Sequence, residues 1–417
     1  MIAYSSVLTL SMNFIGMFNN TIWGNYSTYN EAAVGKYATK ADWLKAQGIY
    51  NKELVKGSFI RDVSVITDKS LYTQIAQYFD AFQGEYSSEY GHKVSGTKAG
   101  RLFSSDILFF TTNAAEHQIQ MQGMIMLMLN QKTKLNGKEV NLTEIFEKDN
   151  RGILRVKKGA QFSEKDKMAF INKLHAINKS LHGNYNKFDK SLMQRHWWGK
   201  LLLQFRKYMY TSYKRRYQKE QIDVELGDTV QGYYNTFFGS LYQAIKQKDY
   251  AFLTDFKDKA TAEERAAWIK TRADLVFLAG LLIFSSLIGG LGDDDDEYNK
   301  TTLNHLSLQS RRLIGDITML TPIGVLDGDL LRIMRNPVVS TSSTGLLIDA
   351  FGQTGKDVFN LVQGKDLEVY KTNTKYHDSG DSKLKYKWQR TIPWFNNYNK
   401  LVNPETQLNV FNRPAWQ

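Results

Sequence analysis

Apolar side chains recur every three or four residues in several stretches of the chain, which is the spacing of one face of an α-helix. This pattern is clear over residues 71–82 and again after Ser163. Between Ser105 and Gln131 the apolar residues become so dense that a helix buried on nearly all sides is predicted. These segments predict a mainly α, multi-helix protein.

Two helix starts are marked by capping residues. Ser163 precedes Glu164 and Asp166, and Thr261 is followed three residues later by Glu264, which is the spacing of a capping box. A side-chain oxygen at such a position accepts a hydrogen bond from an unpaired backbone N–H of the first turn. We therefore expect helices to begin at these two sites.

The remaining segments lack this periodicity and divide the chain into four predicted regions. Residues 1–160 form a less regular N-terminal mixed region, in which alternating residues between Gly152 and Gly159 suggest a small β-hairpin. Residues 161–300 form a helical region, residues 301–371 form short helical pairs, and residues 372–417 form an extended, aromatic tail. A cluster of Ser and Thr at residues 340–344 is interpreted as a break between helices.

The segment from Arg195 to Lys219 is basic and contains no acidic residue. Wound as a helix, it places an apolar stripe on one face and Lys residues at seven-residue intervals elsewhere. Such a helix can lie on anionic lipid, follow the phosphates of a nucleic acid, or pack with its charged face toward water or an acidic subunit. The candidate residues for binding an anionic partner are Arg195, Lys200, Arg206, Lys207, Lys214, Arg215, Arg216 and Lys219.

An uncharged apolar segment spans residues 275–292 and is followed directly by the acidic run 293–297. At about 1.5 Å per residue it would extend roughly 27 Å as a helix, slightly less than a hydrocarbon core of about 30 Å. The clustered carboxylates would resist crossing a bilayer, so burial in an oligomer and insertion into a membrane are both open. The candidate contact residues are Leu275, Phe277, Leu278, Leu281, Leu282, Phe284 and Leu287.

The C-terminal tail carries large aromatic side chains without helical spacing, and Pro393, Pro404 and Pro414 interrupt any long helix. Aromatic residues on an extended segment are suited to pockets on another surface. We expect the tail to lie ordered across the helical body of its own chain or across an adjacent subunit, and the alternative is a flexible terminus. The candidate anchors are Trp388, Trp394, Phe395 and Trp416.

Composition narrows the function classes. The 417-residue chain has no cysteine, which excludes disulfides, zinc–thiolate sites and thiol nucleophiles, and its net charge of +12 favours acidic partners. The acidic run lacks the ligand spacing of an EF-hand, and no nucleotide-binding or hydrolase motif is present. We therefore expect no metal, no cofactor and no small-molecule substrate, and we expect that the protein is not an enzyme. The N-terminal apolar stretch has no preceding Lys or Arg, so no secretory signal is predicted.

Three features together resemble a known family. The motif from His196 to Gly199 leads into residues 203–209, a glycine-containing apolar helix with an acidic run follows, and Arg311-Arg312-Leu313 precedes Pro322 and Asn336-Pro337. Over residues 191–351 the chain resembles the large virion cargo and ejection polypeptides of crAss-like and related tailed phages that infect Bacteroidetes. The resemblance implies a protein packaged in the capsid or tail lumen and passed through the tail into the host. It carries over no catalytic residue.

The resemblance also sets the expected partners and location. It implies contacts with other virion proteins and with further copies of the chain, a place inside the capsid or tail, and a later place in the host envelope or cytoplasm. DNA and an anionic membrane are further candidate partners. The main alternative function is a nucleic-acid-associated component of the virion transcription machinery, and a bacterial membrane-attached protein is a third class.

Overall fold

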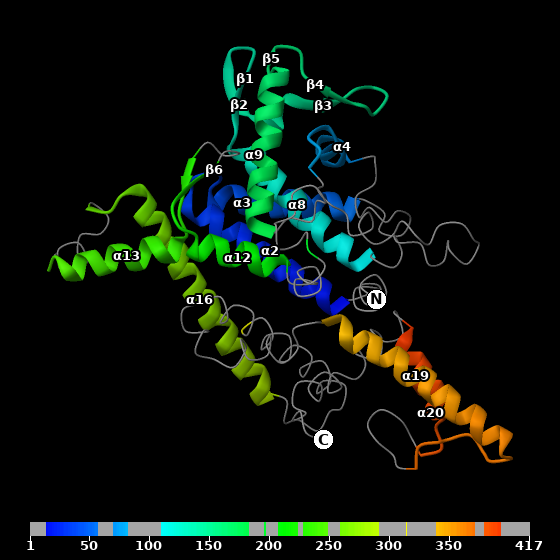
Figure 1. Cartoon of the computed structure of the whole chain (residues 1–417). Helices are drawn as coiled ribbons and strands as arrows, with labels where there is room; N and C mark the ends of the chain where they lie inside the picture. Colours follow the sequence, from blue (N-terminus) through cyan, green and yellow to red (C-terminus); the bar gives the residue numbers. More distant parts are fainter. Residues whose placement is uncertain are drawn as a thin grey trace.

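The computed structural model describes residues 14–56, 70–81, 110–182, 196, 207–223, 228–248, 259–291, 314, 339–371 and 379–392. The protein is mainly α, as the sequence predicts. Within the described residues it has ten α-helices and a few short antiparallel strands (Figure 1). The helices predicted over residues 306–336, apart from Ile314, and the acidic run 293–297 lie outside these residues.

The main hydrophobic core is built around α8 (Phe110–Asn130), which lies beside α2 (Phe14–Val34) and α3 (Lys40–Lys56) (Figure 1). Consecutive apolar side chains of α8 from Met124 to Met128 are buried, which confirms the helix predicted to be enclosed on nearly all sides. At Gly24 of α2, an added Cβ would lie 2.2 Å from the side chain of Ile119 in α8. Glycine therefore permits these two helices to approach closely.

The N-terminal region is more regular than predicted. Besides α4 (Leu71–Tyr78), which confirms the first eight residues of the helix predicted over residues 71–82, it contains the helices α2 and α3. The pattern of α2 is weak because part of its buried face is polar: Ser27, Thr28, Asn30 and Glu31 are all buried. A search for apolar periodicity does not detect such a helix.

The predicted hairpin lies within a small group of strands next to α9 (Glu164–His182). Strands β3 (Phe146–Lys148) and β4 (Leu154–Val156) pair antiparallel, and Gly152 lies in their connection with φ +80°. Strands β1 (Lys132–Leu135), β2 (Lys138–Asn141) and β5 (Ala160–Gln161) form a sheet in the order β2-β1-β5, and the short 3-10 helix η1 covers Leu142–Ile145. The hairpin prediction is confirmed, with strands a few residues earlier than expected.

The second half of the described chain adds α12 (Lys207–Tyr217), α13 (Tyr233–Lys246) and α16 (Ala262–Leu291), with strands β6 (Gln221–Asp223) and β7 (Asp228–Val230) between α12 and α13. Both predicted helix starts are confirmed. The Thr261 N–H donates to Glu264 Oε2 at 2.8 Å, and the Ser163 N–H donates to Asp166 Oδ2 at 2.9 Å.

Two helices lie at the C-terminal end of the described chain. α19 (Val339–Val362) runs straight through the Ser/Thr cluster that was interpreted as a break, so that interpretation is wrong. α20 (Lys383–Thr391) lies within the segment predicted to be extended, and its N-cap Ser382 accepts a hydrogen bond from the Lys385 N–H. The two helices pack against each other (Figure 1).

Candidate functional site

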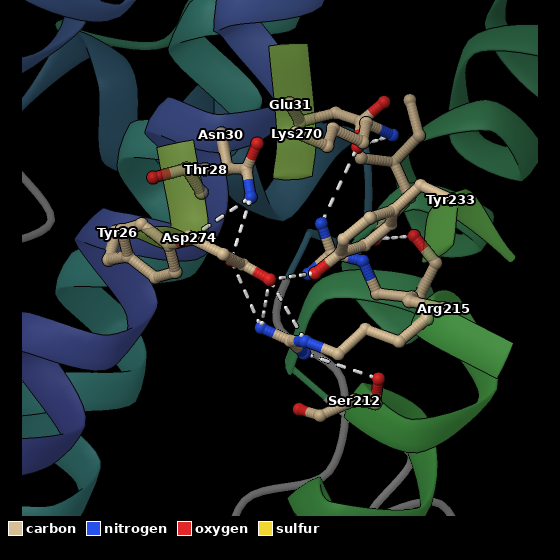
Figure 2. Close-up of polar contacts among 12 residues, drawn as sticks. Tyr26, Thr28, Asn30, Glu31, Ser212, Arg215, Tyr233, Lys270 and Asp274 are labelled. Atoms are coloured by element: carbon tan, nitrogen blue, oxygen red, sulfur yellow. Dashed lines mark hydrogen bonds and ion pairs between the residues drawn. The ribbon is translucent and has the colours of Figure 1, made fainter. Parts of the chain in front are cut away.

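Four helices that are distant in sequence meet at the carboxylate of Asp274 in α16. Tyr26 reaches it from α2, Arg216 from α12, and Tyr233 and Tyr234 from the first turn of α13. We call these five residues the Asp274 cluster. Figure 2 shows the Asp274 carboxylate pointing toward an arginine guanidinium, with Tyr26 on one side and Tyr233 on the other.

Both oxygens of Asp274 are held by several donors. Oδ1 accepts from the Tyr26 hydroxyl and from Arg216 Nη2 at 3.1 Å. Oδ2 accepts from Arg216 Nε at 3.0 Å, from the Tyr233 hydroxyl at 2.5 Å and from the Tyr234 hydroxyl at 2.9 Å. Bonds of this kind to a charged group are stronger than those between neutral groups. The carboxylate therefore fixes the positions of three neighbouring helices at once.

The cluster is buried, with side-chain exposures of 0% for Asp274 and 2% for Arg216. Burial works to lower the pKa of Arg216, but the oxygens of Tyr233 and Asp274 outweigh it and the pKa is raised. Burial and the charge of Asp274 raise the pKa of Tyr26 and of Tyr234. The guanidinium therefore stays charged and the phenols stay protonated, so each phenol is a donor.

A second set of charges lies one helical turn away on α16. Lys270 Nζ donates to Glu31 Oε2 of α2 at 2.8 Å, and Arg215 Nη2 of α12 lies 3.6 Å from the same oxygen. Burial works to raise the pKa of Glu31, but Lys270 and Arg215 overcome it, so the pKa is lowered. Arg215 and Arg216, which are neighbours on α12, thus pair with two different carboxylates, Glu31 of α2 and Asp274 of α16.

Close backbone packing and aromatic contacts hold the helices at this site. An added Cβ at Gly232, the N-cap of α13, would lie 2.5 Å from the Arg216 carbonyl oxygen, so only glycine fits where α13 meets α12. The Tyr26 ring stacks on Phe277 of α16 with 4.0 Å between ring centroids. Trp23 and Tyr26 also pack against Leu278 and Leu281.

The geometry of the Asp274 cluster is that of a polar anchor between helices. Because donors occupy both carboxylate oxygens, Asp274 is not placed to remove a proton or to bind a metal. In the described part of the chain, no group of three or more His, Asp or Glu side chains is arranged to hold a metal ion. What the arrangement does is specify which four helices meet and in what register.

The structure changes the interpretation of two residues that were predicted to bind an anionic partner, Arg216 and Arg215. Arg216 is buried against Asp274, and Arg215 is mostly buried beside Glu31, so the anions that they bind in this fold belong to the same chain. Lys214 and Lys219 are exposed, and their proposed contact with an anionic partner stays a prediction. Arg195, Lys200 and Arg206 lie outside the described residues, and for Lys207 the backbone alone is described, within α12.

The predicted apolar contact residues of α16 separate into two faces. Phe277, Leu278 and Leu281 pack against α2 of the same chain, so the structure already supplies their partner. The other face is open to solvent. It is formed by Leu275, Val276, Leu282, Ile283, Phe284 and Leu287, each 46–62% exposed. No helix in the described ranges is both long and apolar enough to be a candidate membrane span.

Of the predicted tail anchors, Trp388 lies in the described residues. Its ring meets Phe351 of α19 edge-on with centroids 5.1 Å apart, and its Nε1 donates to Thr354 Oγ1 at 2.9 Å. This part of the tail therefore packs against a helix of its own chain, but it does so as helix α20, so the predicted extended conformation is wrong for residues 383–391. Trp394, Phe395 and Trp416 lie outside the described residues.

The Asp274 cluster was not predicted from the sequence. Its one visible signal is an acidic residue between Lys270 and Arg272 on one side and a long apolar run on the other, inside a helix. A charge in such a position requires a partner, but the sequence does not show which one. No protein-family model, no curated protein and no solved structure matches this chain.

Proposed function

We propose that the chain is a non-enzymatic virion protein of a tailed phage, stored in multiple copies inside the capsid or tail and ejected into the host with the genome. The resemblance over residues 191–351 suggests this class of protein. The main observation in support of the proposal is the open apolar face of α16. In a stored, closely packed state, neighbouring proteins would cover this face.

The size of this face supports an assembled state. Six large apolar side chains between Leu275 and Leu287 are about half exposed or more, on successive turns of one helix. Contiguous apolar surfaces of this kind mark sites of contact with protein or membrane. Close packing with other virion proteins or other copies during storage would remove this surface from water.

The lack of covalent crosslinks and the small number of prolines are compatible with passage through a narrow tail. The chain has no cysteine and its first 321 residues contain no proline, so no disulfide must be broken and few slow proline isomerisations can delay refolding. The Asp274 cluster is non-covalent, and a buried ion pair of this kind is weak evidence for stability. Its use here would be to select the correct helix arrangement when the chain refolds.

Ejection gives the same surface a second partner. Once in the host envelope, the open face of α16 would meet lipid headgroups and acyl chains in place of protein. Contact with the envelope would then be peripheral, and a cytoplasmic location would need another protein to cover the face. The proposed locations are thus the particle interior first and the host envelope or cytoplasm afterwards.

A second candidate function is association with nucleic acid as part of the virion transcription machinery. The net charge of +12 and the exposed Lys214 and Lys219 favour it. Arg215 and Arg216 weaken it, because their charges are used inside the fold.

Quantitative mass spectrometry of purified particles tests the proposal. We expect peptides of this chain at many copies per particle, protected from protease until the particle is opened, and peptides in host fractions soon after infection. Capsid and portal proteins of the same particles provide the stoichiometric references. Absence from washed particles, or protease sensitivity in intact ones, would refute storage inside the virion.

A further inference from the structure

Helix α19 buries a partly polar face and exposes an apolar one. Gln353 and Asp357, together with Ala350, are buried on the side that meets α20 and the segment after α19. The Gln353 amide nitrogen donates to Asp357 Oδ1 at 3.1 Å, and the Glu368 N–H donates to the same oxygen at 3.3 Å. The opposite side is strongly exposed, and it carries Ile348, Phe359 and Val362. Phe351 and Val358 are also exposed but lie at its edge, where the Phe351 ring contacts Trp388 of α20. A helix with this inverted pattern needs a second apolar surface to cover its exposed apolar side chains.

The spacing along the exposed face describes the surface that it fits. Gly345, Ile348, Gly352, Gly355, Phe359 and Val362 follow one another at alternating steps of three and four residues. This is the seam of a two-helix contact, and it lies on the side of α19 away from Ala350, Gln353 and Asp357. A Cβ added at Gly345, Gly352 or Gly355 would have no atom within 4 Å. No contact within the described chain therefore requires glycine at these positions.

We propose that this face of α19 binds the same face of α19 in a second copy of the chain, with the two helices antiparallel. The pairing places Ile348 of one copy beside Phe359 of the other, and Val362 beside Gly345. Gly352 of each copy then meets Gly355 of the other at the crossing point. The glycines meet at the crossing point, so the helix backbones can approach closely there. The large side chains meet toward the two ends of the contact, either one another or an open glycine.

Charge on one edge of the seam selects the antiparallel orientation. Asp349 and Lys356 flank the seam on the same edge, at equivalent positions one heptad apart. In an antiparallel pair, equivalent edge positions of the two copies face each other, so Asp349 of each copy lies near Lys356 of the other. In a parallel pair, this edge would face the opposite edge of the second copy, and Lys356 would lie beside the apolar Phe351. Asp349 already bonds Lys387 at 2.9 Å, and its side chain stays 53% exposed and open to a second cation.

The size of the contact predicts weak pairing in dilute solution. The seam from Gly345 to Val362 is about 27 Å long, which gives an interface near or below the usual lower bound of about 1,200 Å². We therefore expect association in the micromolar range, which becomes substantial wherever many copies are held close together. The inference rests on α19 alone and does not depend on the proposed function.

Because the chain has no cysteine, disulfide trapping reports this geometry without background. We expect a mixture of full-length I348C and F359C, one of them carrying a size tag, to form a mixed disulfide dimer under mild oxidation. Each variant alone should form at least tenfold less. Equal or greater self-linking by I348C alone would indicate parallel helices and would overturn the proposal.

Sedimentation velocity of full-length variants supplies the second test. Gly352→Leu and Gly355→Leu fill open space, so we expect an unchanged or higher melting temperature together with at least tenfold weaker self-association. Asp349→Lys and Lys356→Asp should each weaken association, and the double variant should restore it, which loss of the bond to Lys387 does not explain. A wild-type chain that stays monomeric at hundreds of micromolar, or one that binds neutral lipid vesicles through this face in place of a second copy, would contradict the proposal.

Discussion

Helices α8 and α16 carry the two most apolar runs of the described chain, and they differ in how they are covered. In α8, every side chain from Met121 to Met128 is buried by other parts of the chain. In α16, the half before Asp274 is anchored by polar contacts, and the half after it packs one face on α2 and exposes the other. An apolar run therefore indicates that a helix needs to be covered, but it does not indicate by what.

This difference separates stability from assembly. Substitutions in α8 should act on the folding of the single chain. Substitutions on the open face of α16 should act on its contacts with other molecules. The predictions below test this division, from the largest expected effect to the smallest.

Removal of the Asp274 carboxylate should be the most destabilising change. Asp274→Ala leaves Arg216 buried without its partner, and breaking a buried pair in this way costs about 3–5 kcal/mol. The double variant Asp274→Leu with Arg216→Met removes both charges and should recover part of that loss, because the three tyrosine hydroxyls still lose their acceptor. Urea unfolding followed by circular dichroism measures both. Equal destabilisation of the single and double variants would show that the cluster is not a coupled pair.

Leucine truncation in the two helices should give opposite results. Leu127 is fully buried in α8 and Leu287 is 62% exposed in α16. Leu127→Ala should cost about 3 kcal/mol of unfolding free energy, whereas Leu287→Ala should cost less than about 0.5 kcal/mol. The same chemical change is made in both, so each is the control for the other. A large loss at Leu287 in the monomer would mean that another part of the chain covers it.

The α8 core should also make stability dependent on pH. Burial lowers the pKa of His117 to about 4, below its value of about 6.5 in the unfolded chain. The unfolded state then binds the proton more readily than the folded state. The contribution of His117 to the free energy of unfolding is therefore fully present above about pH 6.5 and is lost as pH falls toward 4. At about 1.4 kcal/mol per pKa unit, the loss by about pH 4.5 is about 2–3 kcal/mol. In His117→Gln the acid destabilisation should be smaller by that amount, and an unchanged pH profile would exclude this origin.

The exposed part of the basic segment should give the smallest effect. If Lys214 and Lys219 contact phosphates, binding to DNA or to anionic vesicles should weaken steeply as salt rises. Reversing both charges to Glu should leave the fold intact. It should reduce the slope of the logarithm of the binding constant against the logarithm of the salt concentration by about one for each phosphate contact that is lost. Charge reversal at Arg216 would instead unfold the site, so it is not a test of binding. Tight binding whose affinity changes neither with salt nor with these substitutions would show that the segment is purely structural.

Much of the helical framework could be predicted from local sequence. Helices α8, α9 and α16 carry apolar periodicity or capping residues, and these signals depend on neighbours in the chain. Helix α2 was missed because its buried side uses Asn30 and Glu31, whose partners lie about 240 residues away in α16. Helix α19 was missed in part because its N-terminal turns contain Ser and Thr and because Gly345, Gly352 and Gly355 interrupt its apolar stripe.

The site was harder to predict for the same physical reason. Arg216 lies in a run of basic residues, and this run predicts contact with an external anionic partner. The anion that Arg216 binds is Asp274 of the same chain, 58 residues further on. Ion pairs between distant segments leave no local pattern, whereas caps and apolar stripes do.

Photo-crosslinking in the phage particle that we propose contains this chain tests most directly whether protein covers the open face of α16. A photoreactive residue replaces Leu287 in one sample and Met124 in a control sample. We predict that position 287 forms crosslinks to other protein chains, and that position 124 forms them only within its own chain. Crosslinks from position 287 to solvent or lipid alone, with none to protein, would contradict storage by protein packing.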